Sequence, residues 1–167
     1  MKKENQQMKN MDLLPDDEAV IRTYTNMVYR LAFSRTQCRD DADDIYQEVF
    51  LRYIRKHPVF SCEEQRKAWL LRVTINCAKK FHLSFWQRKT GPLEEDIVFE
   101  TKENEELYME LRRLPEHYRM VIHLFYYEEL SVEEISQLTN TKPSTVRTQL
   151  TRARRRLRTI MEEEKYV

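Results

Sequence analysis

The sequence predicts an all-α protein built from two small helical domains joined by a flexible acidic linker. Its 167 residues contain one glycine, whereas sheets with tight hairpins usually need several turn glycines. Apolar residues recur at spacings of three and four, which is typical of amphipathic helices. The pattern is interrupted by a stretch that holds the glycine, a proline and many acids. We therefore expect domains at 14–89 and 107–162 and a linker at 90–106.

Composition narrows the class of protein. Cys38, Cys62 and Cys77 are widely spaced, odd in number and outside any C-x-x-C pair, so neither a disulfide framework nor a zinc knuckle is expected. No apolar run reaches membrane-spanning length, and the polar start MKKENQQMKN lacks the apolar core of a signal peptide. We expect a cytoplasmic protein without a cofactor. The net charge is only +1, but acidic and basic residues are gathered in separate stretches. This separation says more about the protein than the net charge does.

Two helices open the first domain. From Asp17 to about Ala32, apolar residues fall at spacings of three and four and predict a core-facing amphipathic helix. A second helix is predicted after Arg39, with acids at its amino end and bases at its far end, the order that the helix dipole favours. Its inward positions leave three polar residues toward solvent or a partner: Asp44, Gln47 and Glu48.

Acids at the start of this second helix allow one enzymatic interpretation. Asp40, Asp41 and Asp44 spell D-D-x-x-D, and oxygen ligands at that spacing can hold magnesium on a diphosphate. No second acidic motif completes such an ion cage, and the chain is short for the deep apolar pocket that this chemistry needs. Acids at a helix amino end explain the run more simply, so we expect neither a metal site nor an enzyme.

A third, long helix is predicted from about Gln65 to Arg88, after a break at His57 and Pro58. Its expected core seam is Ala68, Leu71, Ile75 and Ala78. A different side carries an aromatic ring, an amide and cations: Trp69, Val73, Asn76, Lys80 and Gln87. Such a stripe can stack on unpaired bases, bond their edges and hold the backbone of a separated DNA strand.

The alternative for this stripe is that Trp69 belongs to the core and that the lysines are merely solvated. Further basic and aromatic residues gather near the end of the helix: Lys79, Lys80, Trp86, Arg88 and Lys89. A cluster of this kind favours a nucleic-acid surface over an ordinary solvated face.

The second domain ends in a predicted helix-turn-helix over Leu130 to Leu157. Ser131 and Glu134 form a capping box that starts a short helix ending near Leu138. Asn140 tolerates a left-handed turn, and Pro143 suits the first turn of a new helix. Two helices joined by a tight turn are therefore expected.

On the last helix, one stripe is apolar and the opposite face is polar and basic. The stripe that should face the core is Val146, Leu150, Ala153 and Leu157. The opposite face carries Ser144, Thr148, Thr151 and Arg155, flanked by Arg147 and Arg152. In a helix-turn-helix, early residues of the second helix meet base edges in the major groove, while Arg, Ser and Thr around them contact phosphates. The alternative is a solvated basic helix that closes a bundle, but caps, turn, seam and basic face together favour DNA.

The order of these parts resembles the sigma-70 family of bacterial RNA polymerase initiation factors, and specifically its extracytoplasmic-function (ECF) branch. Four stretches carry the resemblance: DDADDIYQEVFLRYIRK, AWLLRVTINCAKK, LPEHYRMVIHLFYYEELSVEEISQL and STVRTQLTRARRRL. The resemblance implies a non-enzymatic subunit that docks on core RNA polymerase and selects promoter DNA. It also implies an anti-sigma factor as a partner and no small-molecule substrate.

The resemblance implies roles for three sets of residues. Those that would contact the clamp helices of the polymerase are Asp44, Gln47 and Glu48. Those that would capture the melted downstream, minus-ten element are Trp69, Asn76, Lys79 and Lys80. Those that would contact the upstream, minus-thirty-five element are Ser144, Thr145, Arg147, Thr148, Thr151 and Arg152.

The chain departs from the family pattern in the turn of the hairpin. The family commonly has Gly where Asn140 stands, and a small residue where Lys142 stands, so Thr141 is the expected substitute for the cap of the last helix. The alternative function is a two-domain helix-turn-helix regulator that acts without docking on core polymerase. It predicts an α/β receiver, but the first ninety residues lack hydrophobic strand patterns.

Overall fold

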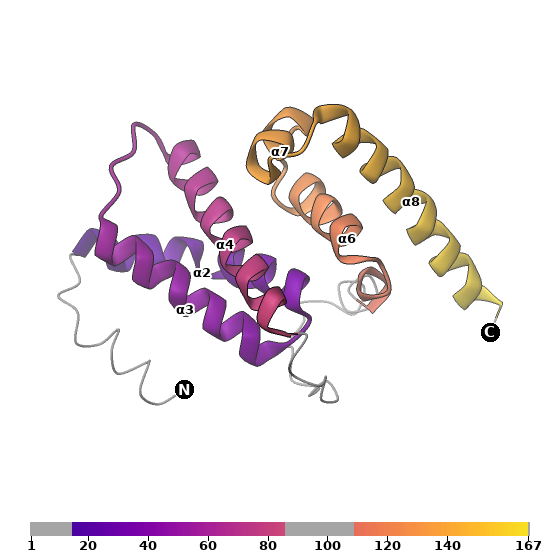
Figure 1. The fold of residues 1–167 in the computed structure, drawn as a ribbon, viewed down its shortest axis with the longest axis horizontal. Helices are drawn as coiled ribbons and strands as arrows, with labels where there is room; N and C mark the ends of the chain where they lie inside the picture. Colours follow the sequence, from indigo (N-terminus) through magenta and orange to yellow (C-terminus); the bar gives the residue numbers. More distant parts are fainter. Residues whose placement is uncertain (1–14, 86–108, 167) are drawn as a thin grey trace. The chain divides into compact units, whose positions relative to one another are not determined.

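The computed structural model describes residues 15–85 and 109–166, and every regular element in these ranges is a helix (Figure 1). The chain forms two compact units, Met1–Arg88 and Lys89–Val167. The predicted all-α class with two helical domains is confirmed. The predicted linker at 90–106 lies outside the described residues, and so do Trp86, Arg88 and Lys89 of the predicted basic and aromatic cluster.

The first unit consists of three helices, α2 (Pro15–Thr36), α3 (Arg39–Lys56) and α4 (Glu63–Phe85), each of which packs on the other two (Figure 1). Their shared core consists of fully buried apolar side chains, including Val28, Leu31, Ile45, Val49, Phe50, Leu70, Leu71 and Ile75. The helices end where the backbone turns left-handed, at Gln37 (φ 53°) and His57 (φ 41°). His57 caps α3 by donating its backbone N–H to the Tyr53 carbonyl at 2.9 Å.

The core seam predicted for α4 was partly wrong. Leu71, Ile75 and Ala78 are buried as expected, but Ala68 is exposed. The buried stripe instead centres on Leu70, Leu71, Thr74, Ile75, Cys77 and Ala78. At 100° per residue, Ala68 lies about 100° around the helix from the middle of that stripe. Alanine spacing alone did not fix which way the helix faces, because the packing of α2 and α3 decides it.

The second unit contains a short helix at 109–112, α6 (Glu116–Ile122) continued by a π-helical turn η1 (His123–Tyr127), α7 (Val132–Thr139) and α8 (Pro143–Lys165). Its buried side chains include Leu111, Leu114, Val121, Leu124, Ile135, Val146, Leu150 and Ala153. Buried Arg119 donates to the Leu114 carbonyl at 2.8 Å, which satisfies a backbone group that would otherwise be stranded in the core.

The predicted helix-turn-helix is confirmed in its local details. The Ser131 hydroxyl accepts from the Glu134 N–H at 3.1 Å, and the Glu134 carboxylate accepts from the Ser131 N–H at 2.7 Å. Asn140 follows α7 in the left-handed conformation (φ 53°), and Pro143 is the first residue of α8. These bonds and dihedrals depend on neighbours within a few positions, which is why the sequence could predict them.

The cap predicted for α8 was wrong. The residue that precedes the helix is Lys142, and its side chain makes no capping bond. Thr141 lies one position too early, and its hydroxyl donates to the Thr139 carbonyl at 3.3 Å instead.

None of the helices in the described ranges is both long and apolar enough to span a bilayer.

Candidate functional site

The polar face of α8 lies open to solvent in the second unit. Val146, Leu150 and Ala153 are buried against α6 and α7, so the opposite side of the helix points outward. The six residues expected to contact the upstream element are all exposed: Ser144, Thr145, Arg147, Thr148, Thr151 and Arg152. The structure therefore places them together on one accessible surface, the α8 polar face. Their predicted role in DNA contact stays a prediction.

Two hydroxyls on the α8 polar face are oriented by the helix itself. Thr148 donates to the Ser144 carbonyl and Thr151 donates to the Arg147 carbonyl, each at 3.0 Å. Because the proton of each hydroxyl is used, its oxygen lone pairs point outward as acceptors. An acceptor so placed can bind an amino group on a base edge, such as that of cytosine or adenine.

Sequence reasoning missed one residue beside this surface. Glu133, in the first turn of α7, accepts from Arg147 Nη2 at 2.9 Å, although the two residues are 14 positions apart. One feature of the sequence could have indicated this contact. A capping box uses only one of the two adjacent acids Glu133 and Glu134, which leaves the other available for a different partner.

The stripe predicted on α4 is partly packed and partly exposed. Trp69 is half-buried, with its ring edge-to-face against Tyr53 and Phe60 at centroid distances of 6.0 Å each. The residues further along the stripe are exposed: Asn76, Lys79 and Lys80. Trp69 is thus neither sealed in the core nor free, and its indole is held in a fixed orientation by two rings.

A network of side-chain contacts connects the loop before α4 with α2 and α4. Tyr24 of α2 donates its hydroxyl to Glu63 at 2.8 Å, and Glu63 forms an ion pair with Arg66. The Arg66 guanidinium lies 5.7 Å from the centre of the Phe60 ring, a cation–π contact. Burial, and then the bond to Glu63, raise the pKa of Tyr24 to about 12. The network fixes Phe60, and through it the position of Trp69.

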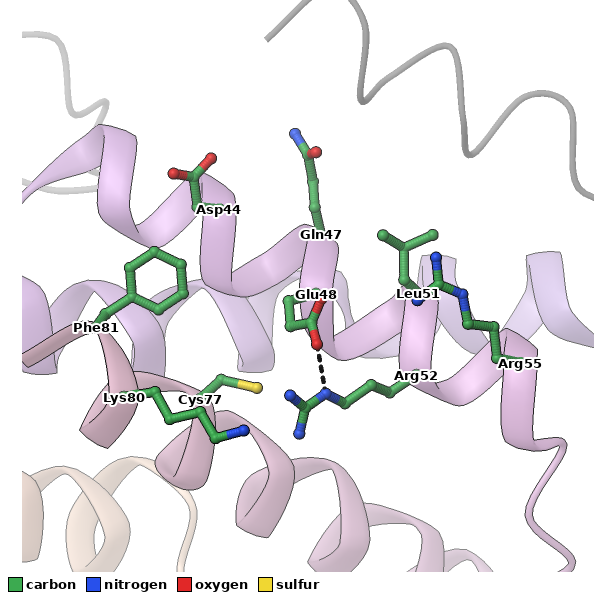
Figure 2. Close-up of a pocket in the computed structure, with 9 residues that line it drawn as sticks. All are labelled: Asp44, Gln47, Glu48, Leu51, Arg52, Arg55, Cys77, Lys80 and Phe81. Atoms are coloured by element: carbon green, nitrogen blue, oxygen red, sulfur yellow. Dashed lines mark hydrogen bonds and ion pairs between the residues drawn. The ribbon is translucent and has the colours of Figure 1, made fainter. Parts of the chain in front are cut away.

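The three residues expected to contact the polymerase line a groove between α3 and α4 of about 380 Å³ (Figure 2). The complete lining is Asp44, Gln47, Glu48, Leu51, Arg52, Arg55, Cys77, Lys80 and Phe81. Asp44 and Glu48 are half-buried, in line with the prediction, but Gln47 is only 9% exposed. Gln47 was expected to face solvent or a partner, and its low exposure does not agree with a position open to solvent.

Charges of both signs meet in this groove. Glu48 accepts from Arg52 at 2.6 Å, and Figure 2 shows this pair facing Cys77 and Lys80 of α4. The bond to Glu48 raises the pKa of Arg52, and burial raises the pKa of the Cys77 thiol. Such a surface offers donors, acceptors and an apolar floor, which suits a protein partner better than a small apolar ligand. Lys80, predicted to contact DNA, also lines the groove.

Asp40 and Asp41 lie in the first turn of α3, where the helix dipole stabilises them. Within the part of the chain that the structure describes, no three His, Cys, Asp or Glu side chains are grouped as metal ligands.

Comparison with known proteins matches two family models to this chain. The model for sigma-70 region 2 matches residues 20–87, and the model for sigma-70 region 4 matches residues 104–157. The first match contains α3 and α4, and the second contains the helix-turn-helix. The two matches together span most of the chain.

Individual relatives agree with these matches. The RNA polymerase sigma factor SigV of Bacillus subtilis is 31% identical over 143 residues, 81% of this chain and 85% of the relative. The ECF RNA polymerase sigma-E factor of Haemophilus influenzae is 32% identical over 158 residues, 81% of this chain and 82% of the relative.

Solved structures agree on the fold. The sigma factor RpoE, co-crystallised with the anti-sigma factor NepR from Bartonella quintana, matches with a TM-score of 0.71 at 18% identity, over 89% of this chain and 98% of that one. The alternative of a regulator with an α/β receiver is not favoured, since residues 15–85 are helical wherever they form regular structure. The chain therefore belongs to the sigma-70 family of RNA polymerase sigma factors, in its extracytoplasmic-function subfamily.

Proposed function

We propose that this sigma factor docks on core RNA polymerase through the groove between α3 and α4 and contacts promoter DNA with both units. The observation that carries the proposal is the α8 polar face, whose hydroxyls and guanidiniums are exposed on the second helix of a helix-turn-helix. The chain itself makes or breaks no covalent bond, and it supplies binding energy that directs the polymerase to a promoter.

In the second unit, the first turns of α8 enter the major groove at the upstream element. Ser144, Thr145 and Thr148 stand near the start of the helix, where base edges are reached. Arg152 lies further along and contacts phosphate, which positions the helix without specifying sequence. Arg147 lies next to Thr148 in the same early turns and has the donor geometry for the N7 and O6 atoms of guanine.

In the first unit, the stripe on α4 captures unpaired bases of the downstream element. The exposed part of the Trp69 ring offers a stacking surface, and Asn76 offers both a donor and an acceptor for a base edge. Lys79 and Lys80 attract the strand backbone. Binding of separated bases then offsets the loss of stacking within the duplex.

Partners follow from the same surfaces. The groove that contains Asp44, Gln47 and Glu48 receives helices of the polymerase. One structural relative, RpoE, is known in a complex with the anti-sigma factor NepR, and another, CnrH, in a complex with the cytosolic domain of CnrY. We infer that an anti-sigma factor also holds this chain when its promoters are silent.

The deciding experiment is run-off transcription with purified core polymerase on a library of genomic promoter fragments. The expected result is promoter-specific transcript that depends on the added chain, with weak binding of the chain alone to the same DNA. Absence of transcript from every promoter would overturn the proposal. Strong, sequence-specific binding without polymerase would favour the regulator that acts alone.

Arg147→Ala tests the contact to the upstream element. Loss of one bidentate contact should reduce discrimination at one base pair by about 5- to 150-fold, corresponding to about 1–3 kcal/mol. The matched control is Arg158→Ala, an exposed arginine on the same helix about 16 Å further along. An unchanged base preference in the Arg147 variant would remove that assignment.

A further inference from the structure

The ion pair between Glu133 and Arg147 crosses the turn of the helix-turn-helix. Its oxygen and nitrogen are 2.9 Å apart, and the side chains are 63% and 58% exposed. Glu133 belongs to α7, so the pair reaches the α8 polar face from outside that helix. The capping box of α7 uses the neighbouring Glu134, and the helix start therefore does not depend on Glu133.

The stability of the fold does not explain why this ion pair is present. Exposed ion pairs contribute about 0–1 kcal/mol to folding. Affinity for DNA does not account for it either, because a carboxylate beside the binding surface repels phosphates. What the carboxylate does in this place is restrict the arginine side chain, which has several rotatable bonds and considerable conformational entropy.

We propose that Glu133 is a positioning residue that holds the Arg147 guanidinium toward a base edge and away from the phosphates. The proposal rests on the upstream-element function given above. Arginine has five N–H donors in a planar fork, and the bond to Glu133 engages one of the two Nη2 hydrogens, leaving the second Nη2 hydrogen and the Nε and Nη1 donors available. A guanidinium fixed in this way is ready to bind the acceptor edge of guanine, whereas an unrestrained one exchanges among nearby phosphates.

The test uses the full chain with core polymerase and promoter DNA randomised at the upstream element. Wild type, Glu133→Ala, Arg147→Ala and the double variant are compared by sequencing the bound fraction. The matched control is Glu162→Ala, an exposed acid near the far end of α8. Thermal unfolding of each variant confirms that it is folded.

Glu133→Ala should lower discrimination about threefold at the base pair affected by Arg147→Ala, in line with the coupling measured for exposed charge pairs. Other base pairs should keep their preferences, and the double variant should lose no more than Arg147→Ala alone. The control should leave discrimination unchanged.

Three results would overturn the inference. If Glu133→Ala leaves the Arg147-dependent base pair unaffected while Arg147→Ala changes it, this proposal fails and the proposed function stands. A loss at a different base pair would mean that Glu133 contacts a base itself. A wild-type holoenzyme without any upstream preference would overturn the proposed function and this inference together.

Discussion

Trp69 shows how packing and exposure combine in a single residue. Its ring is held edge-to-face by Tyr53 and Phe60, yet the side chain is only half-buried. Rings held in this way lose little further conformational freedom when a base stacks on them, so less of the binding energy is spent on ordering. The Phe60 ring is likewise held in place, by its cation–π contact with Arg66. If Trp69 contacts DNA as proposed, these aromatic contacts hold its stacking surface in place before DNA binds.

Asn76→Ala should chiefly impair opening of the promoter. The exposed amide of Asn76 can both donate to and accept from a base edge. We expect about a tenfold loss of open complexes, equal to about 1.4 kcal/mol, with little change in closed-complex binding. Permanganate reactivity of the melted thymines measures this. Asn26→Ala, at an exposed asparagine on α2, is the matched control. A normal bubble in the Asn76 variant would contradict the assignment.

Tyr24→Phe should reveal a pH-dependent contribution to stability. The folded pKa of Tyr24 is about 12, raised from 10.0 by burial and by Glu63. Because the folded value exceeds the unfolded one, the contribution is complete below pH 10 and is lost as the pH rises from 10 to 12. At neutral pH the variant should be less stable by about 0.5 kcal/mol, the low end for a hydrogen bond.

Urea unfolding of wild type and the Tyr24 variant between pH 8 and 11.5 checks this expectation. The difference in unfolding free energy between wild type and variant should shrink above pH 10. In an ultraviolet titration, the variant should lack one phenol that ionises near pH 12 in wild type. A difference that stays constant across the range would contradict the raised pKa of Tyr24 in the folded state.

At the scale of helices, the sequence predicted what depends on near neighbours and missed what depends on other helices. The capping box at Ser131, the left-handed Asn140 and the proline start of α8 are decided within a few residues. The exposure of Ala68 is decided by the way α2, α3 and α4 pack against one another, and the low exposure of Gln47 could not be read from helical spacing either. Amphipathic spacing gives the buried side of a helix only to within a residue or two.

The same distinction holds within the candidate site. The exposure of the α8 polar face followed from four apolar residues at helical spacing, since the opposite side of an amphipathic helix must face outward. The Glu133–Arg147 pair could not be predicted in the same way. It depends on the angle between α7 and α8, which the hairpin turn and the side chains packed beneath it determine together.

Asn140 offers a test of the hairpin turn. Its backbone is left-handed (φ 53°), a conformation that costs most residues about 1 kcal/mol or more but costs glycine little. Asn140→Gly should therefore be tolerated, and Asn140→Ala should destabilise the chain by about 1 kcal/mol. Thermal or urea unfolding measures both. Gln137→Ala, at an exposed position within α7, should be neutral. Equal stability of the Ala and Gly variants would contradict the strain argument.

At the scale of the whole molecule, each unit has its own core. The buried side chains of the first unit come from α2, α3 and α4, and those of the second come from residues 109–166. The two family models match the units separately, at 20–87 and 104–157. From the separate cores and separate matches we predict that the chain between the units acts as a tether, which would raise the effective concentration of one unit once the other is bound.

Cutting this tether tests its role. A specific protease site placed within 90–106 should leave both units folded after cleavage, because neither core loses a helix. Transcription at nanomolar protein concentration should fall at least tenfold, since the second unit must then bind at its own bulk concentration rather than at an effective concentration of about millimolar. The uncut variant is the control, and circular dichroism monitors folding. At micromolar concentration the loss should shrink, because mass action replaces the tether. Full activity at nanomolar concentration after complete cleavage would show that docking on the polymerase alone holds both units in place.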